Sequence, residues 1–349
     1  MSEPTGKGLT VYRRPEEDTN GKTGLGRYAD VVEYCLEGRD YDIVISDATS
    51  ARGYWNMFLN GFWRPVRQSR KLNSNDTVCH ATDELCSMVF PFVKGKKIMT
   101  VHHVSFKEGR FDLFYRMWMM ITKTGIRKSQ RVIAISEATK QDLIRIGCPE
   151  EKIVVIVNRV DPKFRKKDLP KKHSVFCMGQ LAPRKNMGDA LRAFIELVKN
   201  EGMDDWTITF CGDGPEKDGL LAMAEEAGIS DRVRIVTGIS EEEVVDLYNE
   251  AMLVFNTSLL EGTGLVTLEA QRCGTPVLHL NRAQIPEPVT RLSIGCEDPS
   301  DMAKKAFDIV SDPEGYEDLC RRSKEYADSF GGDFKERYLQ LIEDVRNGS

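Results

Sequence analysis

The chain has 349 residues, of which 41% are hydrophobic and 30% charged, a composition typical of a globular protein with enough length for two domains. Its 49 Lys and Arg against 54 Asp and Glu give a net charge of −5, which argues against a dedicated nucleic-acid-binding protein. No apolar run reaches the roughly 18 to 20 residues of a membrane-spanning helix, and the N-terminus carries no signal-peptide core, so we expect a cytoplasmic protein.

The first half of the chain alternates strands with helices. Hydrophobic periodicity predicts strands at residues 9–13, 41–46, 77–81, 97–103, 131–135 and 153–157. It predicts helices between them at residues 28–36, 111–126 and 137–146. This alternation indicates an α/β domain with a parallel sheet.

A glycine-rich loop, Asn20 to Arg27, separates the first strand from the first helix. It does not fit a Walker A motif, because Glu16 stands where that motif requires glycine. It does not fit a dinucleotide fingerprint either, because about ten residues lie between strand and helix instead of a tight turn. Two interpretations remain: Gly24 and Gly26 offer backbone N–H donors to a phosphate or an acceptor, or the loop is a flexible surface segment.

Residues 51–71 mix aromatic side chains with five cations. A segment of this kind can lie on an anionic membrane surface, which would make the protein peripheral at the inner face of the membrane. It can equally be a core helix with a solvated basic edge. Both interpretations stay open.

Two predicted neighbouring strands end on histidine, the first at His80 and the second at His102 and His103. Ligands of open α/β sheets bind outside the carboxyl ends of the strands, so a histidine at this place is a candidate for function. We favour His102 over His80 and His103.

A linker, Asn158 to Pro162, and a charged run, Lys163 to Lys172, precede a second series of strands and helices. Strands are predicted at residues 174–178, 206–211, 233–236, 252–256 and 275–278. Ser240 and Glu243 have the spacing of a capping box at the start of a helix. From residue 302 the chain is predicted to be helical.

These patterns predict three parts. Residues 1–162 form an N-terminal Rossmann-like domain, and residues 163–325 form a C-terminal one. Residues 326–349 contain a last amphipathic helix that packs back on the N-terminal domain.

The stretch from Glu261 to Gly274 places two carboxylates on either side of a glycine-bearing turn. The turn opens a short helix whose N-terminal N–H groups would bind an anion, and Gly262 and Gly264 would let a phosphate approach closely. Glu261 and Glu269 lie up to ~12 Å apart along a helical rise, too far to act together on one sugar carbon. They suit the two ends of one long anionic ligand.

The motifs, in this order, resemble those of the retaining GT-B glycosyltransferases of family 4, and the resemblance covers nearly the whole chain. Besides the glycine-rich loop near the N-terminus, it rests on Thr100-Val101-His102, Val132 to Thr139, Asn158 to Asp161, Gly179 to Asn186, Gly212 to Pro215, and Glu261 to Pro276. The resemblance implies two Rossmann-like domains with parallel sheets facing a central cleft. The first domain would bind the acceptor, and the second the nucleotide sugar.

The activity that this resemblance implies is transfer of a hexose, of the mannose or glucose type, from a UDP- or GDP-linked donor. The acceptor hydroxyl would belong to a glycan, a lipid-linked molecule or a small molecule. No Asp-x-Asp motif stands where a metal ion would hold the diphosphate, and no Cys-x-x-Cys predicts a zinc site. We therefore expect no cofactor and no metal, and front-side displacement with retention.

The resemblance assigns catalytic roles to three residues. Glu261 would hold hydroxyls of the donor sugar, Lys185 would neutralise the leaving diphosphate, and His102 would contact the donor sugar or the acceptor. Glu269 would take the ribose hydroxyls, and backbone N–H groups after Gly264 would take the diphosphate. The predicted donor-binding residues are Gly24, Gly26, Arg184, Gly262, Thr263, Gly264, Leu265, Val266 and Glu269.

Gln180 departs from the family pattern, which has arginine directly after the glycine of this loop. One phosphate-binding charge is therefore missing, unless Arg184 replaces it. This departure keeps open a nucleotide-sugar-binding subunit with weak or no catalysis. A nucleotide-sugar epimerase or hydrolase on the same fold and a nicotinamide-dependent oxidoreductase are the remaining alternatives.

Overall fold

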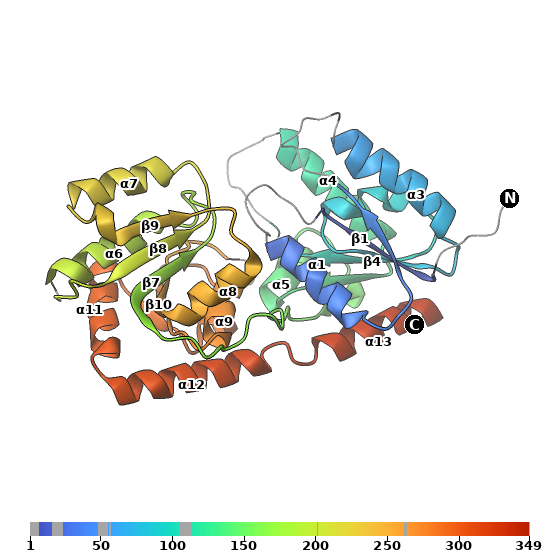
Figure 1. Ribbon diagram of the computed structural model, residues 1–349. Coiled ribbons are helices and arrows are strands. Elements are labelled where there is room, and N and C mark those ends of the chain that lie inside the picture. Colours follow the sequence, from blue (N-terminus) through green and yellow to red (C-terminus); the bar gives the residue numbers. More distant parts are fainter. Residues whose placement is uncertain are drawn as a thin grey trace. The chain divides into compact units, whose positions relative to one another are not determined.

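The computed structural model describes residues 7–15, 24–47, 55, 57–102, 104, 113–200, 202–261 and 264–348 (Figure 1). Contacts within the chain divide it into two compact units. Unit 1 comprises the described residues up to Arg159 together with those from Gly331 on, and unit 2 comprises Val160–Phe330. The division expected from the sequence placed the boundaries after residues 162 and 325.

Unit 1 contains a six-stranded, wholly parallel sheet in the order β2-β1-β3-β4-β5-β6, which confirms the predicted α/β architecture. Its strands are β1 (Leu9–Arg13), β2 (Asp42–Ile45), β3 (Val78–Ala81), β4 (Lys96–Val101), β5 (Arg131–Ala134) and β6 (Ile153–Val155). Its helices are α1 (Gly24–Cys35), the π-helix η2 (Met57–Trp63), α3 (Arg64–Leu72), the 3₁₀ helices η3 (Leu85–Phe92) and η4 (Glu150–Lys152), α4 (Leu113–Lys128), α5 (Glu137–Arg145) and α13 (Phe334–Asn347).

Helices cover both faces of this sheet (Figure 1). Successive side chains of a strand point to opposite faces, so one strand contributes to two cores. On one face Val11 of β1 is buried with Tyr28 of α1 and Leu341 of α13. On the other face Tyr12 packs edge-on against Phe90 of η3, with 6.2 Å between the ring centroids. The C-terminal helix α13 is thus part of the core of unit 1.

The start of α1 differs from the prediction. The helix begins at Gly24, four residues before the expected residue 28, so Gly24 and Gly26 lie in its first turn and not in a loop. Glycine is a weak helix former, but Arg27 and Tyr28 of the same turn are buried, and Tyr28 packs against the sheet. Tertiary packing therefore outweighs local propensity here.

Unit 2 contains a second six-stranded parallel sheet in the order β12-β11-β10-β7-β8-β9. Its strands are β7 (Lys172–Met178), β8 (Thr207–Cys211), β9 (Val233–Val236), β10 (Ala251–Asn256), β11 (Val277–Leu280) and β12 (Ile294–Cys296). Its helices are α6 (Met187–Asn200), α7 (Lys217–Glu226), the 3₁₀ helix η5 (Ser230–Arg232), α8 (Glu241–Glu250), α9 (Leu265–Arg272), α10 (Glu287–Thr290), α11 (Pro299–Val310) and α12 (Pro313–Ser329).

The second sheet is likewise buried on both faces. Phe210 of β8 packs with Phe194 of α6 on one face. Phe176 of β7 packs with Tyr248 of α8 and Leu268 of α9 on the other. Continuous apolar strands of this kind are expected where helices cover a parallel sheet on both sides.

The predicted capping box at the start of α8 is confirmed. Ser240 Oγ accepts the Glu243 N–H at 3.2 Å, and the Glu243 carboxylate accepts the Ser240 N–H at 2.7 Å. The acidic first turns of α8 also bind the charged run that follows the linker, since Lys163 donates to Glu241 at 2.6 Å and Lys167 to Asp246 at 2.6 Å. These contacts hold the start of unit 2 against its own helix.

All nine cysteines are buried, and none of them forms a disulfide. Burial raises the pKa of several of these thiols, for example that of Cys79 to about 11, so they are protonated at neutral pH and unreactive. None of the described helices combines the length and the apolarity needed to cross a bilayer.

Candidate active site

The order of strands in unit 2 reverses between β7 and β10. From β7 the chain continues outward to β8 and β9, and from β10 it continues the other way to β11 and β12. Open α/β sheets bind ligands at the carboxyl ends of the strands at such a switch point. The loops that follow β7 and β10, residues 179–186 and 257–261, therefore frame the candidate donor site.

Hydrogen bonds join these two loops. The Leu259 N–H donates to the Arg184 carbonyl at 2.9 Å, and Thr257 Oγ1 donates to the Asn186 carbonyl at 2.9 Å. The Glu261 N–H donates to the Gln284 carbonyl at 3.0 Å. The backbone before Glu261 is thus fixed on both sides, which orients its side chain.

Lys185 and Glu261, which are 76 positions apart in the sequence, form an ion pair between Lys185 Nζ and Glu261 Oε1. Their side chains are only 11% and 12% exposed, so water screens this pair less than a surface pair. Arg184 Nη1 lies 4.0 Å from the other carboxylate oxygen, and its side chain is more exposed. The structure therefore brings together three of the predicted site residues at the switch point.

The glycines of the neighbouring loops are required by close packing. A Cβ atom on Gly179 would lie 3.1 Å from Lys185 Cε, so the absence of a side chain makes room for the lysine. A Cβ on Gly212 would lie 2.0 Å from the Gly179 carbonyl oxygen, and one on Gly214 would lie 2.2 Å from that of Leu181. All three glycines have φ between 142° and 157°. The loop after β8 thus supports the loop that carries Lys185.

Helix α9 begins at Leu265, four residues after Glu261. Its N-cap, Gly264, has φ 71° and provides no side-chain hydrogen bond to the first turn. A Cβ there would lie 2.8 Å from Val289 Cγ1, so glycine is required at this position. The N–H groups of Leu265 and Val266 belong to the first turn, where helices leave donors for an anion. Gly262 and Thr263, the other predicted binding residues of this turn, lie outside the described residues.

Glu269 lies on the buried side of α9. Its side chain is only 1% exposed, and Tyr248 donates a hydrogen bond to Oε2 at 3.1 Å. A ribose could reach this carboxylate only after a local shift that exposes it. The ribose-binding role of Glu269 stays a prediction.

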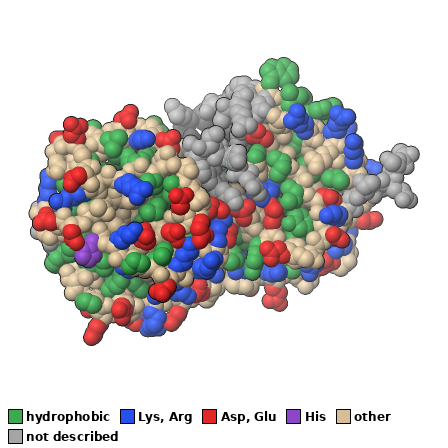
Figure 2. All heavy atoms as spheres, viewed as in Figure 1, with side chains coloured by type: hydrophobic (Ala, Val, Ile, Leu, Met, Phe, Trp, Pro, Cys, Tyr) green, Lys and Arg blue, Asp and Glu red, His purple; other side chains and the backbone are tan. Residues whose placement is uncertain are grey.

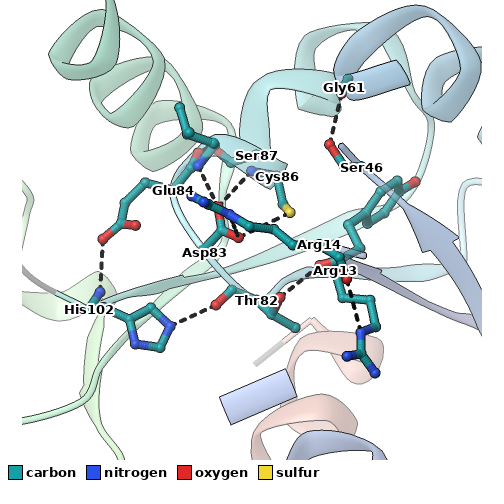
Figure 3. Close-up of polar contacts among 12 residues, drawn as sticks. Arg13, Arg14, Ser46, Gly61, Thr82, Asp83, Glu84, Cys86, Ser87 and His102 are labelled. Atoms are coloured by element: carbon teal, nitrogen blue, oxygen red, sulfur yellow. Dashed lines mark hydrogen bonds and ion pairs between the residues drawn. The ribbon is translucent and has the colours of Figure 1, made fainter. Parts of the chain in front are cut away.

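In unit 1 the order of strands reverses between β1 and β3, and Figure 3 shows the residues that follow these strands. Arg14 donates from Nε to Asp83 Oδ2 at 3.0 Å. The other oxygen of Asp83 accepts the N–H groups of Leu85 and Cys86 at 2.8 and 3.0 Å. Burial alone would raise the pKa of the Asp83 carboxyl, but Arg14 and the hydrogen bond from Cys86 hold that pKa below its ordinary value.

His102 follows β4 directly and is nearly buried (Figure 3). Its N–H donates to Glu84 Oε1 at 2.8 Å, and its ring Nε2 donates to the Thr82 carbonyl at 2.9 Å. The ring also packs edge-on against Tyr28, with 4.8 Å between the centroids. These contacts fix its orientation at the carboxyl edge of the sheet, while its contact with a donor or acceptor stays a prediction.

His80 is part of a buried hydrogen-bond chain and not of the edge where ligands bind. Its Nδ1 lies 2.8 Å from Tyr338 Oη of α13, and its Nε2 lies 2.9 Å from Thr100 Oγ1, which in turn bonds Tyr28. Burial lowers the pKa of this imidazole to about 3, so it stays neutral near pH 7. His103 lies outside the described residues.

Sequence reasoning missed Arg14, Asp83 and Glu84. Asp83 and Glu84 follow the end of β3 by two and three residues, so the rule that selected His102 could have found them too. Arg14 directly follows β1, so the same rule could have found it, but its pairing with Asp83, 69 positions away, could not be read from the sequence. Within the described ranges, no three His, Cys, Asp or Glu side chains are grouped so as to hold a metal ion.

Two family models match the chain. The model described as Glycosyltransferase Family 4 matches residues 30–164, and the one described as Glycosyl transferases group 1 matches residues 159–329. The first covers most of unit 1, and the second covers nearly all of unit 2.

Curated relatives are similar to the chain over part of their length. It is 35% identical over 166 residues to D-inositol 3-phosphate glycosyltransferase of Corynebacterium jeikeium, a match that covers 45% of this chain and 39% of the relative. It is 24% identical over 249 residues to N-acetyl-alpha-D-glucosaminyl L-malate synthase of Bacillus anthracis, covering 65% and 64%. Neither match spans two thirds of the relative's own length.

A solved structure, Anabaena HepE in complex with UDP, has the same fold. Its TM-score is 0.70 at 14% sequence identity, over 96% of this chain and 99% of HepE. The two family models together span residues 30–329. The chain belongs to the family 4, group 1 type of glycosyltransferases and has their GT-B fold.

Proposed function

We propose that the protein transfers a hexose, of the glucose or mannose type, from a nucleoside-diphosphate sugar to an acceptor hydroxyl with retention of configuration. The observation that carries this proposal is the Lys185–Glu261 ion pair at the switch point of unit 2. The donor is UDP- or GDP-linked, and the complex of the similarly folded HepE with UDP favours testing UDP first.

The two side chains of this pair can bind different parts of such a donor. A carboxylate accepts hydrogen bonds from sugar hydroxyls, and an ammonium group neutralises phosphate oxygens. A bound donor replaces the contact between Lys185 and Glu261 with one contact to each side chain. Because the two side chains are held by their own loops, they need little reorganisation for this exchange.

In the proposed step, the bond between the anomeric carbon and the diphosphate oxygen breaks while a bond to the acceptor oxygen forms on the same face. The acceptor proton passes to the leaving diphosphate oxygen. Negative charge builds up on the diphosphate, where Lys185, Arg184 and the first-turn N–H groups of α9 stabilise it. The step needs no metal ion and no cofactor.

In this proposal the acceptor binds to unit 1. Arg14 and His102 lie at the carboxyl edge of its sheet, and both are oriented by buried carboxylates, Asp83 and Glu84. The names of the two relatives, D-inositol 3-phosphate glycosyltransferase and N-acetyl-alpha-D-glucosaminyl L-malate synthase, favour small hydroxylated anions as the first acceptors to test. Glycans and lipid-linked molecules are the next.

Ligand-dependent thermal unfolding tests the donor class. UDP, GDP, ADP and their glucose and mannose conjugates are added at equal concentration, and a ligand that binds the folded state raises the melting temperature. We expect UDP- or GDP-linked compounds to raise it and ADP-linked ones to have little effect. No shift with any nucleotide would overturn the proposal.

The second candidate, a binding subunit without catalysis, is favoured by one observation. Gln180 is exposed at the end of β7, where the family has an arginine, so one phosphate-binding charge is missing from the donor site. If Gln180→Arg creates transfer in an inert wild type, this candidate is correct. Robust transfer of labelled sugar by the wild type eliminates it.

Analysis of the reaction products distinguishes a transferase from the other candidate enzymes. An epimerase or hydrolase on this fold yields an epimerised donor or free sugar instead of a glycosylated acceptor. An oxidoreductase changes the absorbance of a nicotinamide cofactor, and a transferase does not.

A further inference from the structure

Large hydrophobic side chains lie exposed on η2 and beside it. They are Trp55 (78% exposed), Phe58 (46%), Leu59 (45%), Trp63 (49%) and, on η3, Phe92 (49%). Ring contacts make the group continuous, with centroid separations of 6.3 Å for Trp55–Phe58, 5.7 Å for Phe58–Phe62 and 5.0 Å for Phe62–Phe92. We call Trp55, Phe58, Leu59, Phe62, Trp63 and Phe92 the aromatic strip. A contiguous exposed group of this kind marks an interaction surface.

Basic side chains lie on the helices next to the strip. α3 carries Arg64, Arg67, Arg70 and Lys71, and α4 carries Arg116, Lys123, Arg127 and Lys128. Neither helix contains Asp or Glu, nor do η2 and η3. Within the part of the chain that the structure describes, none of these eight cations forms an ion pair with a carboxylate. In a protein of net charge −5 this is a strong local excess of positive charge.

A groove with a volume of about 650 Å³ lies along α4. Its apolar lining includes Tyr115, Met119, Met120, Ile126, Ile146 and Pro149. Cations from α4 and the end of η4 line it as well, namely Arg116, Lys123, Arg127 and Lys152. An apolar groove with basic groups along it has the chemistry to hold an acyl chain next to an anionic head group.

These features share one side of unit 1. α3 and α4 both contact η3 and cover the same face of the sheet. Figure 2 shows Lys and Arg side chains along the edge where α3 lies, next to exposed hydrophobic ones. The outward stripe of α4 repeats the pattern, since Arg116, Met120, Lys123 and Arg127 are all exposed at helical spacing.

We propose that this side of unit 1, formed by η2, α3, η3 and α4, docks on an anionic phospholipid bilayer. The aromatic strip enters the interface between head groups and acyl chains, and the cations of α3 and α4 bind the head groups. The groove along α4 takes a lipid. Charge complementarity favours an anionic surface, and the aromatic strip and apolar groove favour lipid over nucleic acid. The proposal does not depend on glycosyl transfer, because binding needs no donor and no turnover.

Sedimentation with vesicles tests the charge requirement. The full-length protein is mixed with vesicles of phosphatidylcholine alone or with about 30% phosphatidylglycerol, at low and at high salt. Each cation near such a surface contributes about 1 kcal/mol, so R64Q/R67Q/K71Q should weaken binding to the anionic vesicles roughly 100-fold. The matched control K199Q/R234Q/K304Q removes three exposed cations of unit 2, which also form no ion pair among the described residues, and should bind like the wild type.

Tryptophan fluorescence tests which surface enters the bilayer. Lipids brominated on the acyl chain should quench the wild type, because Trp55 and Trp63 lie on the aromatic strip. In Trp55→Phe/Trp63→Phe the strip stays apolar, so the protein should still sediment with vesicles but lose most of the quenching, with a remainder from Trp118 on α4 of the same side. Undiminished quenching in this variant would show that the aromatic strip does not enter the bilayer and would overturn the proposal.

Three further results would contradict the proposal: no binding to anionic vesicles, equal binding to neutral ones, or an equal loss in the unit 2 control. Tight binding to an oligonucleotide that R64Q/R67Q/K71Q abolishes, without vesicle binding, would assign the same cations to nucleic acid instead.

Discussion

The two carboxylates of the donor site are expected to act at different ends of the donor. Glu261→Gln removes the counterion of Lys185 and an acceptor for sugar hydroxyls, so affinity for the bare nucleoside diphosphate should be kept or raised while transfer falls. Glu269→Gln should chiefly weaken nucleotide binding. Calorimetric titration with UDP or GDP, together with transfer rates, measures both effects. An equal loss of diphosphate affinity in the two variants would contradict the assigned roles.

His80 makes the stability of unit 1 depend on pH. The folded protein holds the pKa of this imidazole at about 3, below its ordinary value near 6.5, because the ring is buried. Its stabilising contribution is therefore complete above pH 6.5 and is lost as the pH falls toward 3. At pH 5 the free energy of unfolding should be lower than at pH 7 by about 2 kcal/mol from this group alone.

Urea unfolding at pH 7 and pH 5 measures this dependence. His80→Gln should lower stability at pH 7 but reduce the difference between the two pH values. The same difference in the wild type and in His80→Gln would show that another group titrates.

The functional role of a single residue could be predicted where the residue follows a strand or belongs to a motif of the family. Lys185 and Glu261 follow β7 and β10, and both motifs could be read in the sequence. The burial of Glu269 could not, because it depends on Tyr248 of another helix. The ion pair between Arg14 and Asp83 was likewise hidden, since neither residue type indicates a partner 69 positions away.

At the level of elements, the start of α9 depends on glycine at position 264. Gly264→Ala should destabilise unit 2, because the residue has φ 71° and the new Cβ would lie 2.8 Å from Val289 Cγ1. Gly228 is a matched control, with φ 69° and open space around it. Both alanine variants bear a backbone cost of about 1 to 2 kcal/mol, and only Gly264→Ala bears an added packing cost of roughly 1 to 3 kcal/mol.

Urea unfolding of the two variants separates these costs. Equal losses of stability would mean that the region around Val289 relaxes without cost. A larger loss in Gly264→Ala, with weaker binding of UDP or GDP, would support the role of this turn in holding the diphosphate.

Most elements followed from the sequence, since buried parallel strands give apolar runs and Ser240 gives a clear helix start. The start of α1 did not, because its glycines indicated a loop while the packing of Tyr28 determined the helix. Residues 51–71 were ambiguous for a related reason. Exposure of Phe58 and Trp63 is a property of the packed η2 and α3, and composition alone does not determine it.

For the whole molecule, the two units have separate tasks in this account. Unit 2 holds the donor at its switch point, and unit 1 provides the acceptor site and, on a different side of its sheet from α1 and α13, the surface proposed to dock on a bilayer. Activity should therefore be retained in solution with a soluble acceptor by variants that lose vesicle binding.

The most direct test of glycosyl transfer is the anomeric configuration of the product. The protein is incubated with an α-linked UDP- or GDP-hexose and a soluble acceptor, and proton NMR follows the anomeric signal of the product. We predict an α-linked product, and a rate that Lys185→Ala reduces about 100- to 1,000-fold, because loss of one charge-stabilising donor costs roughly 2.7 to 4 kcal/mol. A β-linked product, or a rate unchanged by Lys185→Ala, would contradict the account.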